Sequence, residues 1–212
     1  METRLIEEFY SDNKIKQRAC MKNFKLDGIC EFYDTEGYLE QRSNFKDGVL
    51  DGFLETYTKG ELRSKRSFKE GYLDGSTELY DEAGELSAII NFKRDLREGI
   101  SKFWSKGQCI REAFYREGFL EGVTKDFASD GTIIQQSTYL RGVLEGSMFR
   151  YWLNGNIREE TEFSNGRTIG ETKYYDEQGK KLSKKRLLDV ATISSNNDKE
   201  IGKIIYELLM MD

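Results

Sequence analysis

The chain of 212 residues contains no histidine and no proline, and it has only three cysteines. Without histidine, the usual general base and the commonest metal ligand are missing, which excludes Ser-His-Asp and Cys-His catalytic sets. Cys20, Cys30 and Cys109 form no C-x-x-C pair, and an odd, sparse set is not a disulfide framework. We therefore expect a protein that is not an enzyme and that has no metal site and no cofactor.

Long apolar runs and an excess of basic residues are also missing. No run of about 18 apolar residues occurs, so no transmembrane helix is expected. The N-terminal residues are polar and acidic, unlike a signal peptide, which predicts a cytoplasmic protein. The net charge is -5, which argues against nucleic acid as a partner.

The composition favours a repeat protein. Hydrophobic residues make up 37% of the chain and charged residues 33%, which leaves little apolar material for a deep core. Repeats that share their core with their neighbours suit such a composition. The 2 Trp, 12 Tyr and 13 Phe argue against disorder.

One short segment recurs along the chain. Phe68–Gly75 reads F-K-E-G-Y-L-D-G, and its second glycine recurs every 23 or 24 residues. The one-residue difference falls in a turn, since Tyr57–Gly60 is one residue shorter than Tyr80–Gly84. A slip inside a strand would move every later side chain to the other face, so length changes confined to turns indicate strands. The other copies begin at Met21, Phe45, Phe92, Tyr115, Tyr139 and Phe163.

Each unit is predicted to be a β-hairpin. Leu39–Phe45 shows a period of two, typical of a strand, and Phe53–Tyr57 is a second, shorter strand. Paired glycines such as Gly71 and Gly75 indicate a tight connection with positive φ. Seven units predict about fourteen strands, preceded by a partial opening unit at Glu8–Arg18.

Stacked hairpins place equivalent residues in columns about 9.6 Å apart. We interpret three columns of aromatic and leucine residues as core packing, and Cys109 as a small core residue. A column of acids precedes each second glycine, and a basic column lies five residues earlier. Charge pairing on the loops is the simpler interpretation, and an acidic stripe for a basic partner is the alternative. The acids are Asp27, Asp51, Asp74, Glu98, Glu121 and Glu145.

This unit resembles the MORN repeat, in the variant common in bacterial proteins named YwqK-like antitoxins, over roughly Phe9 to Leu182. The sequence departs from the pattern at Phe24 and Asp95, which replace the first glycine, and the connections of those copies are left open. The resemblance implies an all-β fold: an elongated, single-layer, twisted antiparallel sheet of about seven stacked hairpins. It also implies a non-catalytic binding or scaffold role.

The repeat fades at the C-terminal end. Lys180–Arg186 is basic and is interpreted as a solvated strand or linker, with an anionic-surface patch as the alternative. Ile201, Ile204 and Leu208 lie on one side of an amphipathic helix. We thus predict a repeat array over residues 1–185, and a linker with a short helix over residues 186–212. The helix caps the array or, alternatively, docks a partner.

Small or polar residues separate the apolar columns of the longer strands. If those columns share one face, these residues line a shallow groove along which a partner binds. The leading prediction is a protein-binding scaffold, in a narrower version an antitoxin for a co-encoded toxin. Membrane-surface or lipid binding is the alternative, disfavoured by the acidic balance, and homo-oligomerisation stays open. The predicted partner-binding residues are Ser64, Arg66, Arg111, Gln135 and Glu159.

Overall fold

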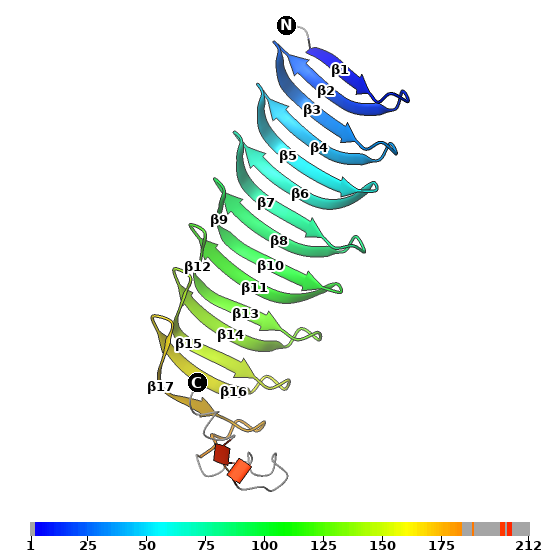
Figure 1. The fold of residues 1–212 in the computed structure, drawn as a ribbon. Helices are drawn as coiled ribbons and strands as arrows, with labels where there is room; N and C mark the ends of the chain where they lie inside the picture. Colours follow the sequence, from blue (N-terminus) through cyan, green and yellow to red (C-terminus); the bar gives the residue numbers. More distant parts are fainter. Residues whose placement is uncertain (1–2, 184–187, 189–199, 202, 205–212) are drawn as a thin grey trace. The chain divides into compact units, whose positions relative to one another are not determined.

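The computed structural model describes residues 3–183, 188, 200, 201, 203 and 204. These residues contain seventeen β-strands, arranged as successive hairpins (Figure 1). The chain divides into two compact units, Met1–Phe119 and Leu120–Asp212. The predicted division at residue 185 and most of the predicted C-terminal helix lie outside the described residues and stay predictions.

Unit 1 is one open antiparallel sheet. Its strands pair in chain order from β1 to β8, β8 also pairs with β9 and β10, and β10 pairs with β11. Its strands are β1 (Thr3–Phe9), β2 (Ile15–Lys22), β3 (Lys25–Tyr33), β4 (Leu39–Lys46), β5 (Val49–Thr58), β6 (Glu61–Lys69), β7 (Tyr72–Tyr80), β8 (Leu86–Lys93), β9 (Leu96–Arg97), β10 (Gly99–Ser105) and β11 (Gln108–Arg116).

Unit 2 is built in the same way, and its strands pair antiparallel in chain order from β13 to β17. A two-residue strand, β12 (Phe119–Leu120), lies at the boundary of the units. The strands of unit 2 are β13 (Gly122–Phe127), β14 (Ile133–Leu140), β15 (Val143–Tyr151), β16 (Ile157–Ser164) and β17 (Arg167–Tyr174).

The predicted all-β, single-layer antiparallel sheet of stacked hairpins is confirmed in each unit (Figure 1). The opening hairpin is longer than predicted, because β1 begins at Thr3 rather than at Glu8. The strand count exceeds fourteen partly for this reason. In addition, two strands are interrupted just before Gly99 and Gly122. The interruptions give the pairs β9 and β10, and β12 and β13.

Turn length accounts for the alternating repeat length, as predicted. The short turn has two residues, Lys59 and Gly60, with φ of +51° and +80°, and it joins the paired residues Thr58 and Glu61. Positive φ at both positions is the hairpin turn whose twist matches the flanking strands. In the longer turn, the amide of Asp34 donates to the carbonyl oxygen of Tyr38 at 2.9 Å.

The two copies that lack the first glycine keep the same connection. Phe24 has φ of +60° and Asp95 has φ of +67°, so both occupy the left-handed region that glycine occupies in the other copies. This conformation is unusual for a bulky residue, and the surrounding hairpins must therefore impose it. The Phe24 side chain is 98% exposed, which shows that its ring is not what stabilises the turn.

Most of the buried residues are small, which corrects the predicted core. The aromatic and leucine columns and Cys109 are mostly half-buried, because a single layer has nothing above the rings to cover them. At the middle of most strands the side chain is short enough for its neighbours to cover, and Ile90 is the large exception among those that are buried. The resulting small-residue row comprises Ala19, Cys30, Ser43, Thr77, Ile90, Ser101 and Ala113 in unit 1, and Thr124, Ser137 and Thr161 in unit 2, each less than 9% exposed.

Two serines on this side of the sheet give a matched pair of predictions. The Ser101 hydroxyl is buried and has no hydrogen-bond partner within the described part of the chain, whereas the Ser64 hydroxyl lies 2.7 Å from that of Thr56. Removing an unsatisfied polar group is neutral or stabilising, so Ser101→Ala should preserve or raise the free energy of unfolding. Ser64→Ala should lower it by about 1 kcal/mol. Urea denaturation measures both, and equal losses would contradict the assignment.

Candidate binding surface

A bulge in one strand of each hairpin sorts the side chains onto two faces. The sequence predicted this strand to be the longer one, but β4 has eight residues and β5 has ten. In β4, Gln41 pairs with Phe32 and Leu39 pairs with Tyr33, so Glu40 has no counterpart on β3. Alternation therefore breaks at this residue, and Leu39 does not share a face with Gln41. The condition for a groove between those two columns is thus not met. The equivalent bulge residues are Lys16, Arg63, Ser87, Ile110, Ile134 and Arg158.

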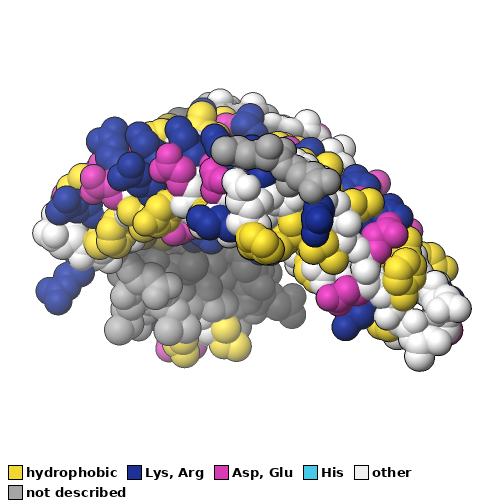
Figure 2. Space-filling model, turned by 90° about the horizontal axis from the view of Figure 1, so that it is seen from above, with side chains coloured by type: hydrophobic (Ala, Val, Ile, Leu, Met, Phe, Trp, Pro, Cys, Tyr) yellow, Lys and Arg dark blue, Asp and Glu magenta, His cyan; other side chains and the backbone are white. Residues whose placement is uncertain are grey.

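We call the face that carries the small-residue row the small-residue face, and the opposite one the charged face. On the charged face of unit 1, cross-strand neighbours alternate in sign over seven strands. Seen from above, basic and acidic side chains also lie interspersed on the described surface (Figure 2). The members of this charge ladder, in strand order, are Glu7, Arg18, Glu31, Arg42, Glu55, Lys65 and Glu78.

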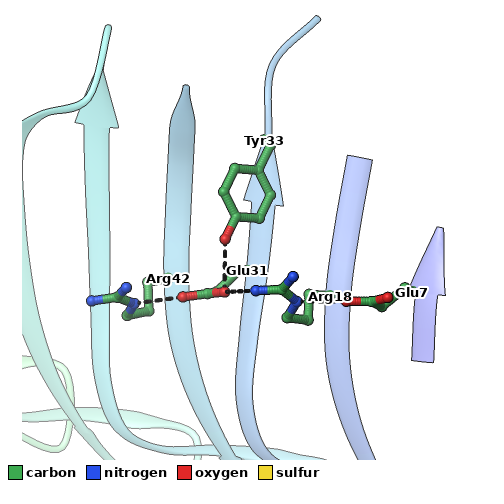
Figure 3. A network of polar contacts seen from close by, with 5 residues as sticks. All are labelled: Glu7, Arg18, Glu31, Tyr33 and Arg42. Atoms are coloured by element: carbon green, nitrogen blue, oxygen red, sulfur yellow. Dashed lines mark hydrogen bonds and ion pairs between the residues drawn. The ribbon is translucent and has the colours of Figure 1, made fainter. Parts of the chain in front are cut away.

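Glu31 is the best-connected member of the charge ladder (Figure 3). Its carboxylate accepts hydrogen bonds from Arg42 Nε at 2.9 Å and from the Tyr33 hydroxyl at 2.8 Å. Arg18 places its Nη1 3.9 Å from Glu31 Oε2. Its Nε lies 2.8 Å from Glu7 Oε1, so Arg18 links the two carboxylates. Glu31 is only 9% exposed, so these partners compensate a charge that is largely removed from water.

Hydrogen bonds and ion pairs on the charged face shift the pKa values of a ladder carboxylate, of a tyrosine beside the ladder and of a carboxylate in unit 2. Burial raises the pKa of the Glu31 carboxyl, but hydrogen bonds from Tyr33 and Arg42 outweigh it and hold that pKa below 4.5. The hydrogen bond to Glu78 is the main reason that the pKa of Tyr80 is raised to about 12. In unit 2, hydrogen bonds from Lys173 and Tyr175 lower the pKa of Glu160.

These carboxylates predict a loss of stability in acid. Because the folded-state pKa of Glu31 and Glu160 lies below the ordinary 4.5, the unfolded chain binds more protons at acidic pH. Their contribution is complete above pH 4.5 and disappears as the pH falls through the lowered values. Thermal unfolding at stepped pH should show this decrease. A Glu31→Gln, Glu160→Gln double variant should be less sensitive to acid, and an unchanged decrease would exclude these two groups as its cause.

The column of acids that precede the second glycines has a structural role that the charge-pairing interpretation did not include. Each carboxylate accepts a hydrogen bond from a turn amide of the next hairpin, as Asp51 does from Glu70 at 3.1 Å. The preceding carbonyl binds the same turn, since the Gly71 amide donates to Leu50 at 2.8 Å. The other acid–amide pairs are Asp27–Asp47, Asp74–Arg94, Glu98–Glu117, Glu121–Arg141 and Glu145–Asn165.

Removing one of these acids should weaken the link between two hairpins. We expect Asp51→Ala to lower the free energy of unfolding by about 1 kcal/mol, as loss of a capping side chain does at a helix end. Asp51→Asn keeps an acceptor oxygen and should cost less. Urea denaturation and the exchange rate of the Glu70 amide report the effect. Identical stability of the alanine variant and the original chain would show that the bond contributes nothing.

The predicted partner-binding residues of unit 1 differ in exposure. Ser64 is only 4% exposed, so it contributes to packing rather than to the accessible surface. Arg66 is half-buried, between its cross-strand neighbours Leu54 and Thr77. Arg111 is exposed on β11.

In unit 2, the structure brings the two predicted residues together. Arg150 on β15 lies between Gln135 and Glu159 on the adjacent strands. Its Nε donates to Gln135 Oε1 at 3.3 Å and its Nη1 to Glu159 Oε2 at 3.3 Å. The Arg150 side chain is nevertheless half exposed, at 50%, so it remains accessible to a partner.

Arg150 also lines a half-open surface pocket of about 660 Å³. Trp152 forms one wall, with its indole nitrogen donating to the Tyr175 carbonyl at 3.1 Å. The Arg158 guanidinium lies over the Trp152 ring, 5.0 Å from its centre. The remaining lining residues are Ile134, Tyr151, Leu153, Asn154 and Glu177.

The polar side chains of the turn order the rim of the pocket. The side-chain amides of Asn154 and Asn156 both donate to the Glu177 carbonyl at 2.7 Å. Leu153 at 68% and Ile134 at 37% exposure leave apolar surface open beside the two arginines. Chemically, this arrangement suits an apolar side chain with a carboxylate next to it.

Sequence reasoning missed Arg150, Trp152 and Arg158 as site residues. Ile134 and Arg158 lie on this surface because both are bulge residues, and the sequence carries no mark of the bulge. The described ranges offer little support for other kinds of site. They contain no group of three or more Cys, Asp or Glu side chains placed to hold a metal. No helix among them has both the length and the apolar composition that a membrane span needs.

Comparison with known proteins supports the repeat at one place. Residues 144–165 match the family model described as MORN repeat variant. No curated protein matches the sequence. Among solved structures, a crystal structure of an S. aureus TarM mutant in complex with Fondaparinux, alpha-GlcNAc-glycerol and UDP shares 14% identity, with a TM-score of 0.34. That match covers 45% of this chain and 19% of that one, too distant a similarity to support an argument.

Proposed function

We propose that this chain is a non-catalytic scaffold built from MORN-like repeats, and that the pocket of unit 2 binds a segment of another protein. The observation that carries the proposal is the pocket itself, with exposed Leu153 and Ile134 beside Arg150 and Arg158. The repeat match at residues 144–165 overlaps its walls and supports a repeat-based binding role. The partner segment carries an apolar anchor next to an acidic residue.

Paired purifications test this proposal. The original chain and a Leu153→Asp variant are each used to capture proteins from the native cell, and the captured proteins are identified by mass spectrometry. Leu140→Asp is the matched control, because Leu140 is 54% exposed in unit 2 but does not line the pocket. A protein lost with Leu153→Asp and retained with Leu140→Asp is the expected partner. Titration calorimetry with that purified protein then measures the loss of affinity, and identical capture by all three chains would refute the proposal.

The narrower proposal is that the partner is a co-encoded toxin which the scaffold neutralises. It predicts that co-expression restores growth to cells making the neighbouring gene product, and that Leu153→Asp abolishes the rescue. Failure of rescue with intact binding would reject neutralisation and keep the scaffold. For the lipid alternative, the charges of the ladder alternate in sign and so form no purely basic row, and sedimentation with anionic vesicles would reveal binding if it occurs.

A further inference from the structure

The edge strand β1 (Thr3–Phe9) is exposed along its whole length. Its seven residues pair with β2, and Figure 1 shows no other strand beside it. Leu5, Ile6 and Phe9 are 58%, 43% and 53% exposed. An edge strand presents a row of backbone N–H and C=O groups ready to pair with another strand.

The side chains of β1 are complementary to a second copy of the strand in one antiparallel register. If Ile6 lies opposite Ile6 of the second copy, Arg4 of each copy faces Glu8 of the other. The pair forms twice because the arrangement is two-fold symmetric. Leu5 then faces Glu7, and all seven residues take part. Opposite-charge pairs directly across an antiparallel ladder stabilise it.

Neighbouring registers are worse. Sliding by two residues in one direction places Glu7 opposite its own counterpart, and like charges in that position are destabilising. Sliding by two residues in the other direction leaves Glu8 and Phe9 without a facing residue in β1 of the second copy. A shift by a single residue would join the small-residue face of one copy to the charged face of the other, because side chains alternate along a strand.

We propose that β1 pairs antiparallel with β1 of a second copy of this chain, in the register that places Ile6 on the two-fold axis. Ile6 already lies opposite Ala19 on β2, so this pairing extends the small-residue face from one copy to the next. Main-chain hydrogen bonds supply the attraction, and the Arg4–Glu8 pairs select the register. The inference does not depend on the proposed function, because it concerns unit 1 alone.

Charge reversal tests the pairing in the full chain. Sedimentation equilibrium over a range of concentrations should show a reversible monomer–dimer equilibrium. Arg4→Glu and Glu8→Arg should each weaken the dimer by about tenfold or more, because each variant sets like charges opposite one another. The combined R4E/E8R variant restores opposite charges and should recover most of the affinity. Glu36→Arg, an exposed reversal in a turn of unit 1, is the control and should leave the dimer unchanged.

A cysteine at the symmetry position gives an independent readout. Facing residues in an antiparallel pair have Cα atoms about 4.5–5.5 Å apart, a separation that a disulfide spans. Ile6→Cys should therefore form a covalent dimer on mild oxidation, well above the level seen with the original chain. A purely monomeric chain at about 200 μM, a dimer indifferent to both reversals, or a lack of recovery in the combined variant would each overturn the proposal. Circular dichroism confirms that each variant is folded.

Discussion

Replacing Gly52 with alanine should destabilise unit 1 by about 2–4 kcal/mol, through two separate effects. Gly52 has φ of +119°, a conformation that residues with a side chain rarely adopt. An added Cβ would also lie 2.7 Å from Asn44 Nδ2 and 3.0 Å from Asn44 Cβ, closer than packed atoms tolerate. The hairpin must therefore distort, or Asn44 must move out of its place on β4. Urea denaturation measures the loss.

Gly37 separates the two effects. It has a similar φ of +98°, but an added Cβ would meet no atom within 4 Å. Gly37→Ala should therefore show only the backbone cost of about 1–2 kcal/mol. The difference between the variants measures the close approach of neighbouring strands at Gly52. Equal losses would mean that this approach has no energetic consequence.

Replacing Glu31 with lysine should cost about 3 kcal/mol, the second large effect. The substitution removes the acceptor for Arg42 and Tyr33 and places a third cation between Arg18 and Arg42. The site is largely buried, so water cannot screen the repulsion fully. Chemical denaturation of the variant and of the original chain gives the difference.

Glu61→Lys is the matched control for this reversal. Glu61 also binds an arginine, with its Oε2 2.7 Å from Arg63 Nη2, but its side chain is 64% exposed. Exposed pairs contribute little, so the change should stay within about 1 kcal/mol. If both reversals cost the same, burial of the ladder is not what makes Glu31 important.

The hairpins were predictable because their signals are local. Glu70 and Gly71 form a two-residue turn with positive φ, and the glycine that marks it is visible within the repeat. The change in turn length between copies can also be read directly from the sequence. The bulge was not predictable, because its residues share no chemical property: Glu40 is acidic, Arg63 basic and Ile110 apolar. One extra residue in each bulged strand was enough to reverse the face of the turn-side apolar column.

The candidate site was only partly predictable for the same reason. Gln135 and Glu159 were predicted from their place between apolar columns, and neither lines the pocket, although both contact Arg150, which does. Arg150 itself lies on β15, the strand that follows the glycine connection, to which no periodic argument was applied. The charge ladder could not be predicted, because its neighbouring members are far apart in the sequence. Arg42 and Glu31 are eleven residues apart, and only the pairing register of the strands brings them together.

The ladder also limits how an array of this kind can change in length. Between Glu7 and Glu78, each strand that contributes an acidic residue to the ladder is followed by one that contributes a basic residue. Every hairpin therefore contributes one charge of each sign. Duplication or loss of a whole hairpin leaves each carboxylate beside a cation. Gain or loss of a single strand would bring two like charges together on adjacent strands. In evolution or in design, such an array should therefore lengthen or shorten by two strands at a time.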